Sequence, residues 1–169
     1  MNIVYAKQVL PIVQRKAIFL AGPTPRSGDV PSWRPQAIEC LKRLGFDGDV
    51  FVPEAEDGVW KKDYDGQVEW EEAGLNQADI ILFWIPRDMK DMPALTTNDE
   101  FGFWKGRDPA KLVLACPDDA VKTTYQKYYA KKYFIPTFSS LDEACRHIAT
   151  ALGEGAERRG GECQVPIHI

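Results

Sequence analysis

Two patterns of hydrophobic positions alternate along the chain. Short, continuous apolar runs are typical of strands that are buried on both faces of a sheet. Such runs occupy residues 16–22, 49–54, 79–86 and 111–117. The mainly apolar residues 1–9 predict a further strand at the edge of the sheet. We therefore expect a sheet of about five strands.

Segments with apolar residues three or four positions apart lie between these runs, which is the spacing of one helix face. They predict helices over residues 32–45, 66–78, 98–106, 120–133 and 139–153. Strands that alternate with helices favour crossover connections and a mainly parallel sheet. The sequence therefore predicts one α/β domain over residues 1–153, built as a three-layer sandwich.

The last segment, residues 154–169, has a different composition. It begins with glycine and charged residues and ends in the apolar stretch "VPIHI". An apolar end is unusual for a solvated tail. We expect this tail to pack on its own domain or on a neighbouring subunit.

Composition and charge exclude several kinds of partner. Hydrophobic residues make up 44% of the chain and charged residues 27%, as in ordinary soluble proteins. A formal net charge of -4 gives no sign of the basic surface that binds nucleic acid polymers. No apolar run approaches the roughly 20 residues of a membrane-spanning helix. Lys7, Arg15 and Lys16 interrupt the apolar start, so we expect no secretion signal and a cytoplasmic location.

The cysteines give no pattern of a metal centre. They are widely spaced and include no CxxC pair: Cys40, Cys116, Cys145 and Cys163. Structural zinc sites use closely spaced ligand pairs. We therefore predict no metal, and expect the first three cysteines to be buried free thiols.

Candidate binding residues follow the first main strand, in the segment "AGPTPRSGD". In open α/β sheets, ligands bind beyond the carboxyl ends of the strands. Gly22, which precedes Pro23, and Gly28 allow close approach of the backbone. Thr24, Arg26 and Ser27 can donate hydrogen bonds to an anion. Neither GxGxxG nor GxxxxGK[ST] is present, so no dinucleotide fingerprint or P-loop is predicted. A simple Gly- and Pro-rich turn stays an alternative interpretation.

Eight carboxylates lie in residues 53–72, with Trp60 and Trp70 among them. Aromatic rings can stack on a base or sugar, and a carboxylate can bind hydroxyl groups. Glu71 shares a helix face with Val68 and Leu75, so it points toward an apolar side. A solvated helix start rich in acids is the alternative interpretation.

The strand-like run 79–86 carries polar and aromatic residues at its ends. Asp79 begins it, and Trp84 lies near its exit. The exit is the better place for a ligand. Asp79 can also be interpreted as the end of the preceding helix.

The segment "TTNDEFGFW", residues 96–104, has two compatible interpretations. Thr97 and Glu100 fit a capping box at the start of a helix. Alternatively, Glu100 is a nucleophile at the mouth of a site, where Asn98 can donate a hydrogen bond and neighbouring aromatic residues supply an apolar wall. A carboxylate held in this way can attack an electrophilic carbon.

Together, the segments "IFLAGPTPR", "SWRPQAIECL", "VFVPE", "VEWE", "ADIILFWIPR" and "TTNDEFGFW" resemble the nucleoside 2-deoxyribosyltransferase-like superfamily, in its bacterial deoxyribosyltransferase-like branch. The resemblance covers about residues 16 to 150 and is most specific from Asp79 to Gly102. It implies a flavodoxin- or Rossmann-like fold. It also implies cleavage or transfer of the N-glycosidic bond of a (deoxy)nucleoside or nucleotide.

The resemblance implies roles for individual residues. Glu100, in the "ExG" setting with Gly102, matches the nucleophile that forms a glutamyl glycosyl-enzyme intermediate. Asp79 matches an upstream acid that holds the sugar and assists departure of the base. Asn98 or Asp99 matches a second acid. The loop at Gly22 and Pro23 matches the sugar-proximal loop, where Arg26 and Ser27 could hold a phosphate.

The family's phosphate loop is absent, so the resemblance leaves a 5'-phosphate open. It implies no cofactor, and it implies a homodimer or higher homo-oligomer because the family often completes its sites across subunits. Two other functions remain as alternatives: a non-catalytic sensor of nucleotides or nucleoside derivatives, and a flavodoxin-like electron carrier.

Overall fold

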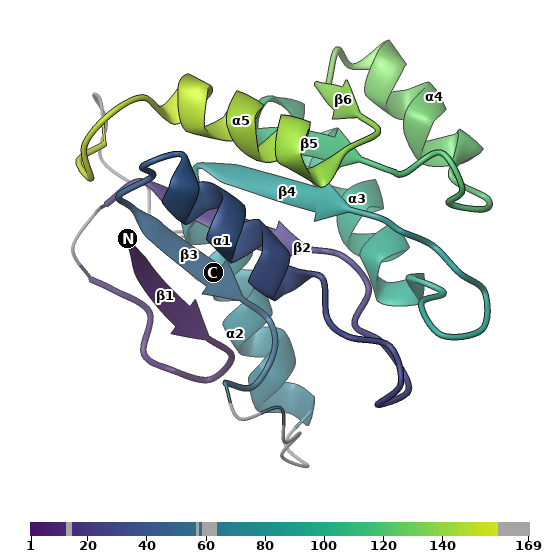
Figure 1. The fold of residues 1–169 in the computed structure, drawn as a ribbon, viewed down its shortest axis with the longest axis horizontal. Coiled ribbons are helices and arrows are strands. Elements are labelled where there is room, and N and C mark those ends of the chain that lie inside the picture. Colours follow the sequence, from purple (N-terminus) through teal and green to yellow (C-terminus); the bar gives the residue numbers. More distant parts are fainter. Residues whose placement is uncertain (13–14, 57, 59–63, 159–169) are drawn as a thin grey trace.

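A computed structural model describes residues 1–12, 15–56, 58 and 64–158. Within these residues, six parallel strands form one sheet (Figure 1). They are β1 Asn2–Tyr5, β2 Ala17–Ala21, β3 Asp49–Val52, β4 Ile80–Trp84, β5 Leu112–Ala115 and β6 Thr137–Phe138. The predicted α/β class and the parallel sheet are confirmed. The sheet has one strand more than expected, because β6 has two residues and is too short to leave a pattern in the sequence.

The spatial order of the strands is β1-β3-β2-β4-β5-β6. Without the edge strand β1, this is the flavodoxin-like order, in which the chain runs outward from a central strand on both sides. The order of connections reverses between β2 and β4. In sheets of this kind, that reversal opens a crevice at the carboxyl ends of the two strands.

Five α-helices within the described residues cover both faces of the sheet (Figure 1). They are α1 Arg34–Arg43, α2 Tyr64–Gln77, α3 Leu95–Arg107, α4 Thr124–Lys132 and α5 Leu141–Leu152, with a short 3-10 helix, η1, at Pro109–Lys111. α1 and α5 pack on one face, while α2, α3 and α4 pack on the other. The predicted three layers are therefore present.

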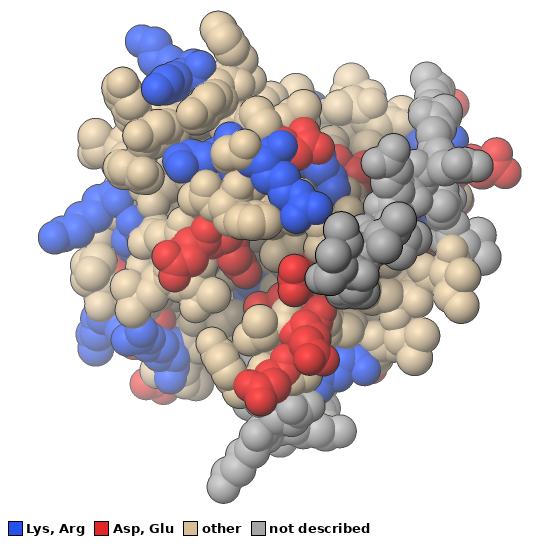
Figure 2. Space-filling model, turned by 180° about the vertical axis from the view of Figure 1, so that it is seen from behind, with Lys and Arg blue, Asp and Glu red and all other residues tan. Residues whose placement is uncertain are grey.

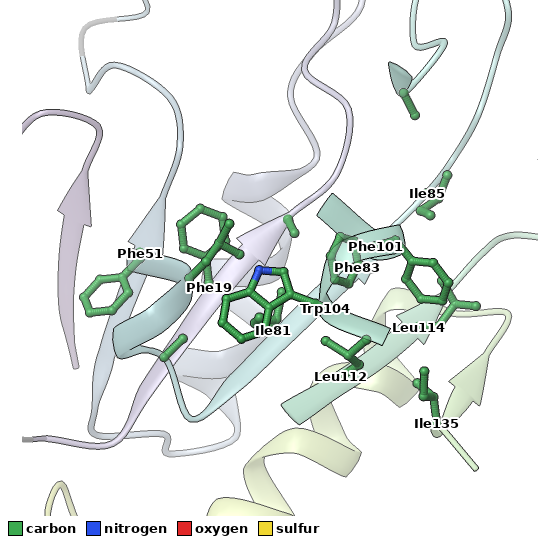
Figure 3. Packing of buried hydrophobic residues seen from close by; sticks show 14 of the residues in the cluster. Phe19, Phe51, Ile81, Phe83, Ile85, Phe101, Trp104, Leu112, Leu114 and Ile135 are labelled. Atoms are coloured by element: carbon green, nitrogen blue, oxygen red, sulfur yellow. The ribbon is translucent and has the colours of Figure 1, made fainter. Parts of the chain in front are cut away.

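Alternate residues of the strands fill two separate cores. Phe19 of β2 and Phe83 of β4 face α2 and α3, while Leu20 faces α1. Figure 3 shows the first core, with Phe101 and Trp104 of α3 lying over the strands. The Phe83 and Phe101 rings meet edge to face, with centroids 5.3 Å apart. This packing fixes the rotation of α3 on the sheet.

The start of α3 differs from the prediction. Ala94 has a left-handed backbone with φ 57°, and the helix begins at Leu95, three residues before the predicted start at 98. Thr97 and Glu100 therefore lie inside the helix, and no side chain caps it. The capping box predicted for these two residues is wrong, and the Glu100 carboxyl does not serve the helix terminus.

The described part of the tail, residues 154–158, runs along the amino edge of the sheet. Its backbone accepts a hydrogen bond at Ala156 from the amide of Lys16, 2.8 Å away. Residues 159–169 lie outside the described residues, as do Trp60 and Cys163. The division at residue 153 and the packing of the apolar end thus stay predictions. Cys40, Cys116 and Cys145 are buried free thiols, as predicted. Among the helices in the described ranges, none is long and apolar enough to cross a membrane.

Candidate active site

A cavity of about 850 Å³ opens at the carboxyl end of β2, between α2 and α3. Its lining comes from the loop after β2, from one face of α2 and from the first turns of α3. Figure 2 views the face of the molecule that α2 and α3 cover, where acidic side chains gather around a hollow. The cavity therefore lies in the crevice that the strand order predicts, and its volume is within the usual range for small-molecule sites.

Gly22 begins the loop after β2 and forms part of the cavity wall. It has a φ of 151°, and a Cβ atom there would lie 2.2 Å from the backbone carbonyl oxygen of Trp84. No side chain fits this contact, so only glycine lets the loop close against the end of β4.

Arg34, the first residue of α1, is buried beneath the cavity and lines it. Its Nη1 donates to Glu54 Oε1 at 2.6 Å and to Thr24 Oγ1 at 3.1 Å. Its Nη2 donates to the carbonyl of Gly22 at 2.7 Å, and its Nε to that of Leu20 at 3.1 Å. One guanidinium thereby ties the end of β2 to the segment after β3.

Sequence reasoning missed Arg34 as a site residue. A signal was present, because Arg34 lies three and four residues before Ala37 and Ile38, on the apolar face of the helix. A cation on such a face is rarely buried without a partner. Burial lowers the pKa of Arg34, and the neighbouring Glu54 carboxylate opposes that shift.

Glu71 points from α2 into the cavity, on the side shared with Leu75. Gln67, one turn earlier, donates a hydrogen bond to Glu71 Oε1 at 2.7 Å. Burial raises the pKa of the Glu71 carboxyl, while the bond from Gln67 and the charge of Arg34 oppose the rise. Glu71 thus lies half-buried on the side of α2 that it shares with Leu75, as the helical spacing predicts, but polar groups surround its carboxyl.

Glu100 points into the cavity from the second turn of α3. Among the described residues, no hydrogen bond or ion pair engages its carboxyl group. Burial raises the pKa of Glu100 to about 8, and the charges of Glu71 and Asp99 add to the rise. Arg34 acts in the opposite direction. Glu71, Glu100 and Arg34 therefore form one electrostatically coupled group.

The cavity brings together seven of the predicted site residues. These are Gly22, Pro23, Thr24, Arg26, Glu71, Asp99 and Glu100. They come from three segments that are far apart in the sequence, which the parallel sheet places at one edge.

Asp79 is not among them, which corrects the prediction that it assists departure of the base. It precedes the first residue of β4 and therefore lies at the amino edge of the sheet, a strand length of roughly 16 Å from the cavity. Its Oδ2 accepts hydrogen bonds from the amide of Ala17 at 2.8 Å and from Arg158 Nε at 3.0 Å. Asp79 thus joins β2, β4 and the tail.

The two predicted tryptophans also lie outside the cavity lining. The Trp70 indole is buried, packs 6.2 Å from the Phe19 ring between centroids, and donates to the carbonyl of Gln8 at 2.8 Å. Trp70 directly precedes Glu71, and consecutive helical residues point about 100° apart. Trp84 packs on the opposite face of the sheet, with the core beneath α1 and α5.

Asn98, Gly102 and Ser27 do not line the cavity either. Asn98 Oδ1 accepts hydrogen bonds from Arg87 and from Gln126 Nε2, which fastens α3 to α4. A Cβ atom at Gly102 would meet nothing within 4 Å, so glycine is not required there.

A comparison with protein-family models matches residues 15–120 to the family described as nucleoside 2-deoxyribosyltransferase like. The match covers more than half of the chain and includes each residue of the coupled group. No curated protein matches the chain.

Proposed function

Because the chain belongs to the nucleoside 2-deoxyribosyltransferase-like family, we propose that it cleaves or transfers the N-glycosidic bond of a (deoxy)nucleoside or nucleotide through a covalent intermediate on Glu100. The observation that carries the proposal is the Glu100 carboxyl itself. It is largely buried, has no partner among the described residues, and faces a cavity large enough for a nucleoside.

In the first step, a carboxylate oxygen of Glu100 forms a bond to C1' of the sugar. The C1'–N bond breaks, and its electron pair stays on the base. Glu71 takes the role of the acid that gives the base a proton, because its pKa is raised and it lines the same cavity. The products are the free base and a glycosyl ester of Glu100.

In the second step, water or a second base attacks C1' and the ester bond breaks. Glu71, now a carboxylate, accepts the proton of the attacking group. Two inversions give net retention at C1', as in retaining glycosidases with two carboxyl groups. Arg34 stabilises the ionised form of Glu100 that the first step needs and that burial disfavours.

We also propose a location in the cytoplasm, a homo-oligomeric state, and chemistry that needs neither metal nor cofactor. The location is supported by the charged residues that interrupt the apolar start of the chain, and the other two points by the resemblance to the family.

Base release tests the function directly. We expect the purified protein to release free base from at least one member of a panel of nucleosides, 2'-deoxynucleosides and their 5'-monophosphates, followed by chromatography. Adding a second base should give exchanged nucleoside if transfer occurs. Binding of panel members without any release would contradict the proposal and favour the sensor.

The pH dependence should report the two coupled carboxyl groups. The reactive form carries one proton, on Glu71, while Glu100 is ionised. Below the lower pKa of the pair both groups are protonated and the nucleophile is lost; above about pH 8 both are ionised and the acid is lost. We therefore expect a bell-shaped profile of kcat/KM whose alkaline side falls near pH 8.

Glu71→Gln should remove that alkaline side. Without the charge of Glu71, the pKa of Glu100 falls. The variant also has no general acid at position 71 whose deprotonation could lower the rate at alkaline pH. We expect kcat/KM to fall by roughly 10²–10⁴ for bases that need a proton to leave. An alkaline side that persists near pH 8 in this variant would assign it to another group.

A further inference from the structure

The walls of the cavity carry an excess of negative charge. Within the described residues, the charged side chains that line it are Glu71, Glu72, Asp99, Glu100, Arg26 and Arg34. Four are acids and two are bases, and the acids come from both helices that face the opening. Glu71 and Glu100 share one proton near neutral pH, so three of the four acids are charged. Figure 2 shows acidic side chains on both sides of the hollow.

The two arginines do not neutralise this charge. Arg34 is already paired with Glu54, at 2.6 Å, and donates its other bonds to Thr24 and to backbone carbonyls. Arg26 is exposed at the rim, where water and salt screen its charge. The start of α3 adds about half a positive charge, which is less than the charge of the acids beside it.

A second observation points to a cationic ligand. The Glu100 carboxyl is largely buried and lacks a partner among the described residues, although it faces the cavity. A positive charge brought to within a few ångströms of this carboxyl favours its ionised form over the protonated form that burial favours. The described lining residues do not supply a free cation at that depth, so a ligand would have to supply it.

From these charges we infer that the cavity selects nucleosides whose base is cationic at neutral pH, and that it disfavours 5'-phosphorylated substrates. That the ligand is a nucleoside rests on the proposed function. The new claim is that the base of this nucleoside is positively charged. An N-alkylated purine or pyrimidine nucleoside has the required chemistry.

The aromatic lining and the bond chemistry both suit such a substrate. Phe103 and Trp104 form part of the cavity wall, and aromatic faces attract cations. When Glu100 attacks C1', the electron pair of the C1'–N bond neutralises the cationic base, which leaves without a proton from Glu71. Water then attacks C1' of the ester, gives up a proton, and regenerates the Glu100 carboxylate.

Isomeric nucleosides that differ in charge test the inference. 1-Methyladenosine is cationic and N6-methyladenosine is neutral, and 3-methylcytidine and 5-methylcytidine form a second such pair. Binding should be measured by calorimetry at neutral pH on Glu100→Gln, which cannot turn the ligands over. This variant keeps the carboxyl groups of Glu71, Glu72 and Asp99 but lacks that of Glu100, so the preference it shows is a lower bound. We expect each cationic isomer to bind roughly tenfold more tightly at low salt, and added salt to reduce the difference.

A second variant keeps the test specific to the cavity. Glu72→Gln, added to Glu100→Gln, removes one lining carboxylate and should reduce the preference for the cationic isomers. Glu143→Gln, on the exposed surface of α5, serves as the matched control and should leave the preference unchanged.

The outcomes separate this inference from the proposed function. Equal affinity for both isomers, tighter binding of a 5'-monophosphate than of its nucleoside, or no binding of either cationic isomer at millimolar concentration overturns the inference, whatever base release the unmodified protein shows. A clear cationic preference supports the inference even if the unmodified protein releases no base, in which case only the catalytic proposal fails.

Discussion

Glu100→Gln should reduce base release by at least about three orders of magnitude while the protein stays folded. A glutamine side chain fills the same space, but its amide cannot form the glycosyl ester. Among the described residues, Glu100 accepts no hydrogen bond and caps no helix terminus. Replacing its carboxylate by an amide therefore breaks no contact that stabilises the fold. Chromatography of released base, at equal protein concentration, measures the effect.

The same variant should be more stable than the unmodified protein at neutral pH. The folded-state pKa of Glu100, about 8, lies above the ordinary value of 4.5, so the folded state binds a proton more tightly than the unfolded state does. The stability of the unmodified protein therefore falls as pH rises from 4.5 toward 8, and the variant lacks this fall. We expect a gain of about 3 kcal/mol in the free energy of unfolding at pH 7 and almost none at pH 4.

Two controls locate these effects at the cavity. Glu69→Gln makes the same chemical change on an exposed side of α2, and turnover and stability should both stay close to normal. Asp79→Asn weakens the contacts to Ala17 and Arg158 and should lower stability by about 1–3 kcal/mol with turnover retained. Near-complete loss of turnover in Asp79→Asn, with a stable fold, would restore the role that the sequence predicts for this residue.

Arg34→Met should cost about 3–5 kcal/mol of unfolding free energy, the largest loss of stability we predict. It leaves the Glu54 carboxylate without its cation and removes the donors to the carbonyls of Leu20 and Gly22. Denaturant unfolding measures the change. A loss below about 1 kcal/mol would contradict the proposal that Arg34 stabilises the fold by connecting the end of β2 to Glu54.

Arg34→Lys distinguishes the effect of the positive charge from that of the hydrogen-bond geometry. It also provides a test if Arg34→Met fails to fold. Lysine keeps the positive charge but cannot make the forked set of bonds. We expect a smaller loss of stability and an alkaline side of the pH profile that stays near pH 8. In folded Arg34→Met, the pKa of Glu100 should rise further, because Arg34 lowers it in the unmodified protein.

The sequence predicted the fold well because buried parallel strands leave a strong signal. Runs such as 79–86 are apolar throughout, and the helical spacing between them permits few topologies. The same periodicity placed Glu71 on an apolar side of α2. The aromatic character of its neighbour Trp70 also predicts a contact with the ligand, yet the helix turns the two side chains apart and the Trp70 ring packs in the core.

Other features could not be predicted, because they depend on contacts between distant segments. The burial of Arg34 is explained only by its hydrogen bonds to Glu54, 20 residues later, and to the carbonyls at the end of β2. The left-handed turn at Ala94 shifts the start of α3 and takes Glu100 out of a capping position. The resemblance favoured Asp79, but the direction of β4 places that residue at the opposite edge of the sheet.

Gly22 packs closely against the backbone of Trp84, so the cavity wall formed by the loop after β2 does not tolerate substitution. The wall formed by α2 and α3 can accept other side chains. Any library of variants meant to change the accepted base should leave the β2 loop untouched, since a single added methyl group would push apart two central strands. Diversity belongs on the exposed lining positions Tyr64, Val68 and Leu95, where a helix tolerates exchange of side chains without moving its backbone. New specificities should therefore arise from the helical wall, whether through laboratory evolution or through natural drift.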